Sequence, residues 1–167
     1  MTTLSELEQQ KAETLDLLHG WAPARLAYRP ALGAWTAAEV IDHIAKVERG
    51  IVAAAQRGLL KPHRIGLRDR LGFLFIERIF LSPRRVKVPA SAPQILPEPD
   101  VNLLTARLRW DESRNQLAQL LAQTAPEQMR EGVFQHPVSG WMSVPQILRF
   151  FSVHVEHHRF QLARLAE

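Results

Sequence analysis

The chain has 167 residues, of which 46% are hydrophobic and 23% are charged, as expected for one globular domain with a substantial core. It contains no cysteine, which excludes disulfide bonds, thiolate metal ligands and a cysteine nucleophile. The formal net charge of +4 is modest and the cations are dispersed, so the composition does not favour nucleic-acid binding.

A first helix is predicted near the N-terminus, where Ser5 and Glu8 have the spacing of a capping box. Gly20 would end this helix, and its apolar face would carry Leu4, Leu7, Leu15 and Leu18. The first residues lack the basic and then apolar profile of a secretion signal, which favours a cytoplasmic location. A loop containing Pro23 and Pro30 is expected next.

A second helix is predicted to begin at Thr36, because Thr36 and Glu39 form another capping box. It would run to about residue 57, with Gly58 as its C-terminal stop. Its buried face would carry Val40, Ile44, Val47 and Ile51. His43 lies beside this face and is therefore expected at the edge of the core.

The next two segments are a strongly apolar helix and a proline-rich connection. Residues 67–81 are apolar on nearly every side, which predicts a short helix sandwiched in the core or docked on another subunit. Contact with a membrane surface is less favoured because a clean polar face is missing, and no apolar run approaches the ~20 residues that span a bilayer. Residues 82–100 cannot be helical and predict a long crossover, since they contain Pro83, Pro89, Pro93, Pro97 and Pro99.

Two further helices are predicted in the C-terminal half. The first spans about 101–124 with Asp100 as its cap, and its core-facing residues would be Leu104, Leu108, Leu117, Leu120 and Leu121. A loop with a brief extended piece covers 133–140, and the last helix starts at the Ser143–Gln146 capping box. The prediction is an all-α protein: one domain over 1–167, built as a four-helix bundle with a long Pro-rich crossover and one extra short helix.

The last helix carries His154, His158 and Gln161 on the face that its other residues make apolar. Polar residues at core positions are costly unless something satisfies them, and two imidazoles four residues apart can be satisfied by one shared metal ion. His43 is the best candidate for a third ligand. Three histidines leave a coordination position open, as in catalytic sites. Such a ligand set is not selective among Zn, Ni, Mn and Fe.

Alternatives remain open for these histidines. His157 also converges with His154 and could replace His158, and all of them could instead be core-edge residues bonded to nearby carbonyls. Glu156 lies about 200° round the helix from His154, so this segment is not the His-Glu-x-x-His motif of zinc proteases, and Glu156 is expected to be solvated. The remaining histidines are expected to be exposed, with a substrate-side role as a weaker hypothesis for the last of them: His19, His63 and His136.

Two segments resemble the DinB-like superfamily. Residues 35–44, with the sequence WTAAEVIDHI, resemble the opening of that family's second helix. Residues 136–161 resemble its glycine-containing loop, its Ser/Thr-capped helix and the His-x-x-x-His-x-x-Gln pattern that here ends at Gln161, whereas 59–130 carry nothing diagnostic. The resemblance implies a four-helix bundle with a long crossover and a divalent metal held by His43, His154 and His158.

The resemblance also implies a function. Characterised members include thiol-dependent S-transferases and isomerases that use bacillithiol, mycothiol or glutathione, and homodimers are frequent. We therefore expect a metal-dependent enzyme of thiol S-transferase or hydrolase type that acts on a small molecule, with a low-molecular-weight thiol as cofactor. Gln161 would contact the bound ligand or orient a histidine; otherwise it caps a buried carbonyl. The competing hypothesis is a non-enzymatic binding or dimerisation module with a vestigial or structural metal site.

Overall fold

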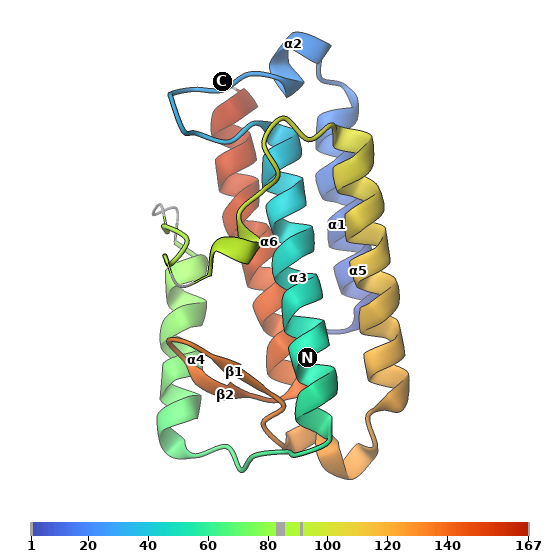
Figure 1. The fold of residues 1–167 in the computed structure, drawn as a ribbon, viewed down its shortest axis with the longest axis vertical. Coiled ribbons are helices and arrows are strands. Elements are labelled where there is room, and N and C mark those ends of the chain that lie inside the picture. Colours follow the sequence, from blue (N-terminus) through green and yellow to red (C-terminus); the bar gives the residue numbers. More distant parts are fainter. Residues whose placement is uncertain (1, 83–85, 91, 167) are drawn as a thin grey trace.

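Four long helices form a bundle in the computed structural model, which describes residues 2–82, 86–90 and 92–166 (Figure 1). These are α1 (Leu4–His19), α3 (Ala37–Leu59), α5 (Leu103–Gln123) and α6 (Val144–Ala166). α3 packs against both α5 and α6, and α1 packs against α6. The predicted all-α four-helix bundle is confirmed.

Smaller elements surround this bundle. α4 (Leu67–Phe80) packs against α6 and against a hairpin of β1 (Phe134–His136) and β2 (Gly140–Met142), which is the extended piece expected in that loop. The loop after α1 contains one unpredicted helical turn, and two 3-10 turns flank α5; these are α2 (Pro23–Leu26), η1 (Pro93–Ile95) and η2 (Pro126–Arg130). Among the described residues, none of the helices has the length and apolarity to cross a membrane.

Two of the predicted helix caps are wrong. α1 is capped by Thr3 rather than Ser5: the Thr3 Oγ1 accepts from the Glu6 amide at 3.2 Å, and the earlier start lets the first turn pack on the core. α5 is capped by Asn102 rather than Asp100, because Asp100 has a left-handed φ of 56° that a cap does not adopt. Both errors arise where several capping residues stand close together in the sequence.

The predicted core residues of α5 are only partly correct, because Leu117 and Leu120 are buried as expected while two others are not. Leu104 and Leu108 are exposed, which corrects the prediction that they face the core. The buried positions include Ala106, Trp110, Arg114, Leu117 and Leu120. Leu104 and Leu108 lie on the opposite side of the helix from these positions at about 100° per residue. The buried Arg114 guanidinium pairs with the buried Glu48 carboxylate of α3, with Nε and Oε2 2.8 Å apart.

α4 lies on the outside of the bundle rather than sandwiched within the core (Figure 1). Only its inner side is buried, through Phe73 and Ile76. An outer stripe of large apolar side chains remains exposed: Leu67, Leu71, Leu74 and Phe75. The prediction that this helix is sandwiched in the core is therefore wrong. The alternative, that it docks on another subunit, stays a prediction. The predicted crossover follows α4 and its η1 turn packs on α3; Pro83 lies outside the described residues.

Gly58 does not stop α3, which continues to Leu59. The absence of a side chain at Gly58 allows the backbone of another segment to pass close to the helix. A Cβ built on Gly58 would lie 1.8 Å from the carbonyl oxygen of Val133, in the segment that leads into the hairpin. The glycine is thus required by a tertiary approach rather than by the helix terminus.

We expect Gly58→Ala to destabilise the fold by about 1–3 kcal/mol, because the backbone at Val133 must move away. Gly50 is the matched control: it lies in the same helix, where an added Cβ would have nothing within 4 Å, and Gly50→Ala should stabilise by about 0.5–1 kcal/mol. Urea unfolding followed by circular dichroism measures both changes. Equal effects of the two substitutions would contradict the close approach.

The core consists of two hydrophobic clusters that meet in the middle of the bundle. On α6 the first cluster ends at Phe151 and the second begins at Val155. On α3 the second cluster extends to Ala45 and the first begins at Val47. His154 and His43 lie close to these junctions, so the fold places both histidines between the two hydrophobic clusters.

Candidate metal centre

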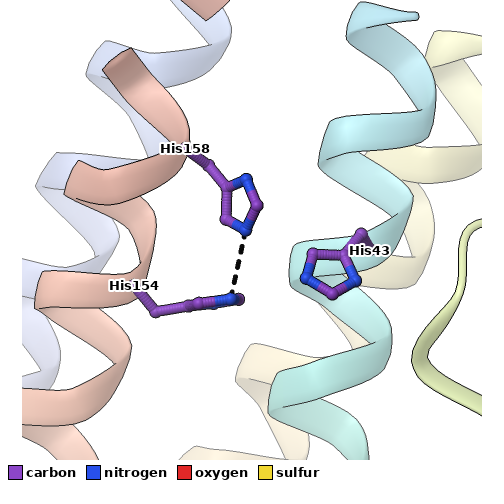
Figure 2. Close-up of side chains that lie close together, drawn as sticks. All are labelled: His43, His154 and His158. Carbon is purple, nitrogen blue, oxygen red and sulfur yellow. Dashed lines mark hydrogen bonds between the residues drawn. The ribbon is translucent and has the colours of Figure 1, made fainter. Parts of the chain in front are cut away.

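The structure brings together three histidines from two helices. His154 and His158 project from successive turns of α6, and His43 projects from α3 toward them (Figure 2). All three side chains are buried, with 3–5% of their surface exposed. One ring nitrogen of each lies within 4.8 Å of the others. α3 is set in register by the predicted Thr36 cap, which accepts from the amide of Glu39 at 3.3 Å.

Hydrogen bonds fix which nitrogen of two rings faces the cluster. The Nδ1–H of His43 donates to the carbonyl of Ile95 at 2.6 Å, and the Nδ1–H of His158 donates to the side-chain oxygen of Gln161 at 3.0 Å. Each neutral imidazole carries one proton, so the Nε2 atom of each ring presents a lone pair. This is the tautomer that a metal ligand needs, with its outer nitrogen already engaged.

His154 completes the cluster differently. Its Nε2 lies 3.1 Å from the Nε2 of His158, whereas its Nδ1 is buried without a hydrogen-bond partner among the described residues. Two nitrogens that share an ion at ~2.0–2.1 Å are separated by about 2.9–3.4 Å at octahedral or tetrahedral angles. The separation between His154 and His158 falls in this range, so the donor set and its spacing fit a divalent metal.

Burial keeps all three rings neutral. Desolvation lowers the pKa of His43 to about 4, although the Ile95 carbonyl opposes the shift. Desolvation also lowers the pKa of His154 and His158 well below the ordinary value, and the neighbouring imidazoles add to the effect. Neutral imidazole is the form that binds metal, so the site does not have to lose protons near neutral pH.

Aromatic rings enclose the cluster. The Trp35 ring lies 4.8 Å from that of His43, and the rings of Phe80 and Phe150 lie 5.3 and 5.6 Å from that of His154. Phe80 comes from the end of α4, so this helix contributes one wall of the site. Such an apolar wall excludes water and strengthens electrostatic interactions inside it.

His157 and Glu156 are not members of the histidine cluster, although the His157 ring packs 5.3 Å from that of His158. His157 is buried, but it does not belong to the histidine group, and its ring packs against Phe80 at 5.3 Å. Burial lowers the pKa of His157, and hydrogen bonding to the Ser82 and Phe80 backbones opposes the shift. Glu156 is half-exposed, 3.6 Å from the Arg159 guanidinium, so it is not placed to act as a base at the histidines.

His136 corrects one prediction, whereas His19 and His63 are exposed as expected. His136 is half-buried because the hairpin turns its ring inward against Phe134 and Phe150. Its Nδ1 accepts from the amides of Val138 and Ser139, both at 3.2 Å. Burial lowers the pKa of His136 to about 4. The ring is therefore a fixed neutral group whose Nε2 carries the proton.

Sequence reasoning missed two contributors to the site. Trp35 precedes the Thr36 cap, and nothing in its spacing shows that its ring will cover His43. The Ile95 carbonyl is a backbone group in the crossover and has no signal in the sequence. Gln161, in contrast, lies three residues after His158 on the same helix, so its contact with that ring follows from helical geometry.

Comparison with known proteins agrees with this architecture. The crystal structure of TT2238, described as a four-helix bundle protein, has a similar fold, with a TM-score of 0.61 and 22% sequence identity over 96% of this chain and 99% of that chain. No curated protein matches the chain. The family model described as the DinB superfamily matches residues 6–162. Because that match extends over nearly the whole sequence, the chain belongs to the DinB superfamily.

Proposed function

We propose that this chain is a metal-dependent enzyme in which His43, His154 and His158 hold one divalent ion, either Zn, Ni, Mn or Fe. The observation that carries the proposal is the orientation of two buried rings, whose outer nitrogens are engaged and whose inner nitrogens face a third imidazole. Three protein ligands leave room for an exchangeable one. A bound ion would lower the pKa of a thiol or water held beside it.

The reaction class we propose is thiol S-transfer or hydrolysis, with a small-molecule substrate and, for transfer, a low-molecular-weight thiol. Membership of the DinB superfamily supports the metal site. Gln161 is proposed to act through His158, to which it is bonded, and to reach a bound cofactor from the same position. The aromatic wall formed by Trp35, Phe80 and Phe150 would keep water from a reactive thiolate.

Metal content tests the proposal directly. Protein purified without a histidine tag should contain, or take up on reconstitution, about one equivalent of a transition metal per chain. Elemental analysis after removal of free metal is the measurement. Less than about a tenth of an equivalent after reconstitution would refute the metal site. Loaded protein should then be screened with thiols and electrophiles, and with simple esters and amides; a metal-loaded protein inactive in all of these would favour a non-enzymatic module.

We also propose that the protein is a homodimer whose contact includes the outer stripe of α4. Its four large apolar side chains lie side by side on one helix face and are exposed in the single chain: Leu67, Leu71, Leu74 and Phe75. Contiguous apolar surface of this kind is typical of protein contacts. Sedimentation velocity measures the mass in solution, and a monomer at micromolar concentration would contradict the proposal.

A further inference from the structure

The end of the crossover is fastened to one face of α3. The side chains at positions 39, 42, 43 and 46 all bind backbone atoms of residues 95–100. These four positions follow the i, i+3, i+4, i+7 spacing of a single helix face. Figure 1 shows this segment running along α3 before it reaches α5. The crossover is therefore held by side chains of the same helix that carries His43.

Asp42 is the centre of this attachment. Its carboxylate is fully buried and accepts from the Glu98 amide at 2.7 Å and from the Arg109 guanidinium of α5 at 2.8 Å. The Lys46 ammonium lies 3.1 Å away and also donates to the Leu96 carbonyl at 2.9 Å. A buried carboxylate is costly unless it is paired in this way, so the contacts form a unit in which each member depends on the others.

Arg109 ties the same segment from a second direction. Its guanidinium bonds the Asp42 carboxylate with one nitrogen and the Glu98 side chain with the other. Glu98 is thus held through its backbone by α3 and through its side chain by α5. Three residues before it, the Ile95 carbonyl accepts from the Nδ1–H of His43. Among the described residues the Ile95 carbonyl is the only acceptor for the His43 Nδ1 proton, and the crossover determines where this carbonyl lies.

We propose that Asp42 is a positioning residue for His43. By holding the Glu98 amide, Asp42 keeps the Ile95 carbonyl over Nδ1 and so keeps the Nε2 lone pair of His43 directed at His154 and His158. The Asp42 carboxylate is bonded to Glu98, Arg109 and Lys46 and not to a histidine ring, so the proposed positioning passes through the crossover backbone. The inference deepens the proposed function and rests on it, because it concerns the outer support of the same three-histidine site.

The test compares Asp42→Asn with Glu48→Gln. Both changes neutralise a buried carboxylate of α3, but Glu48 pairs with Arg114 of α5 and has no hydrogen bond or ion pair with the described residues of the crossover. Long-range proton–nitrogen NMR of the metal-free protein near pH 7.5 reports which nitrogen of each histidine carries the proton. We expect only the Nδ1–H form of His43 in the wild type and in Glu48→Gln, and a mixture of tautomers in Asp42→Asn.

Metal affinity is the second measurement. Titration with Co²⁺ should show affinity reduced about 10–100-fold in Asp42→Asn and unchanged in Glu48→Gln, as expected when a ligand's outer support is lost. An unchanged His43 tautomer together with unchanged affinity in folded Asp42→Asn would overturn the proposal and leave Asp42 with a structural role only.

If Asp42→Asn fails to fold, substitutions of Arg109 in α5 test the same attachment of the crossover by the same tautomer measurement. Arg109→Met should reproduce the mixed tautomer, whereas Arg109→Lys, which keeps the charge, should restore much of the Nδ1–H form. A pure Nδ1–H form in Arg109→Met would overturn the proposal. If the wild-type protein binds no Co²⁺, the proposed function fails, but the tautomer comparison still decides whether Asp42 positions His43.

Discussion

Replacement of His154 by alanine is expected to abolish metal binding, or to weaken it by more than about 100-fold, the upper range for losing only an outer support of a ligand. His154 faces His158 at 3.1 Å between Nε2 atoms, so its loss removes one of the two nitrogens best spaced to share an ion. The wild type and variant would be titrated with Co²⁺ or Ni²⁺ by calorimetry. Quenching of Trp35, whose ring lies 4.8 Å from His43, offers a second signal, with Trp35→Phe as its control.

The matched control is His157→Ala. His157 is also buried and lies on the same helix, and its ring packs 5.3 Å from those of Phe80 and His158, but its nitrogens do not belong to the histidine group. We expect its metal affinity to stay within about threefold of the wild type, a small difference on the scale of outer supports. Circular dichroism should show that both variants fold. If affinity survives His154→Ala but falls with His157→Ala, the proposed ligand set is wrong.

The metal-free protein is expected to lose stability as the pH falls from 7.5 to 5. Burial lowers the pKa of His43 to about 4, whereas an unfolded histidine titrates near 6.5. Below pH 6.5 the unfolded chain therefore binds a proton that the folded chain does not, which favours unfolding. For His43 alone this amounts to about 2 kcal/mol at pH 5. His154 and His158, whose pKa values are also lowered, act in the same direction.

Urea unfolding of the metal-free protein at several pH values measures this loss. The range from pH 7.5 to 5 separates the histidines from the carboxylates. Asp42 and Glu39 have lowered pKa values, so their contribution to stability is lost mainly below this range, where carboxylates of the unfolded chain take up protons, near pH 4. A His43→Gln variant should show a shallower dependence, because one of the titrating groups is gone. Stability that stays constant between pH 7.5 and 5 would contradict neutral, buried histidines.

Local sequence patterns predict much of the fold. The Thr36 and Glu39 capping box sets the start of α3, because a cap and its partner lie within one helical turn. The proline-rich segment is excluded from helix for an equally local reason, the missing amide donor. The errors have the opposite character. Arg114 is a buried charge that no apolar pattern predicts, and its partner Glu48 lies more than sixty residues away in the chain.

His136 shows the same limit at a candidate functional residue. Its place in a loop gives no sign that a two-stranded hairpin presses its ring against Phe150 of α6. Gly58 is similar, since its spacing suggests a helix stop while the reason for glycine is the carbonyl of Val133 passing beside it. In each case the deciding contact joins elements that are distant in sequence.

Helical periodicity is enough to place His154, His158 and Gln161 on one face of the last helix, because 3.6 residues per turn leave no other arrangement. The same reasoning nominates His43 only as a polar residue beside an apolar stripe. The packing of α3 on α6 is what turns these rings toward one another. The bond between the Ile95 carbonyl and His43 likewise arises in the folded chain alone, since the position of a crossover depends on contacts that no local pattern encodes.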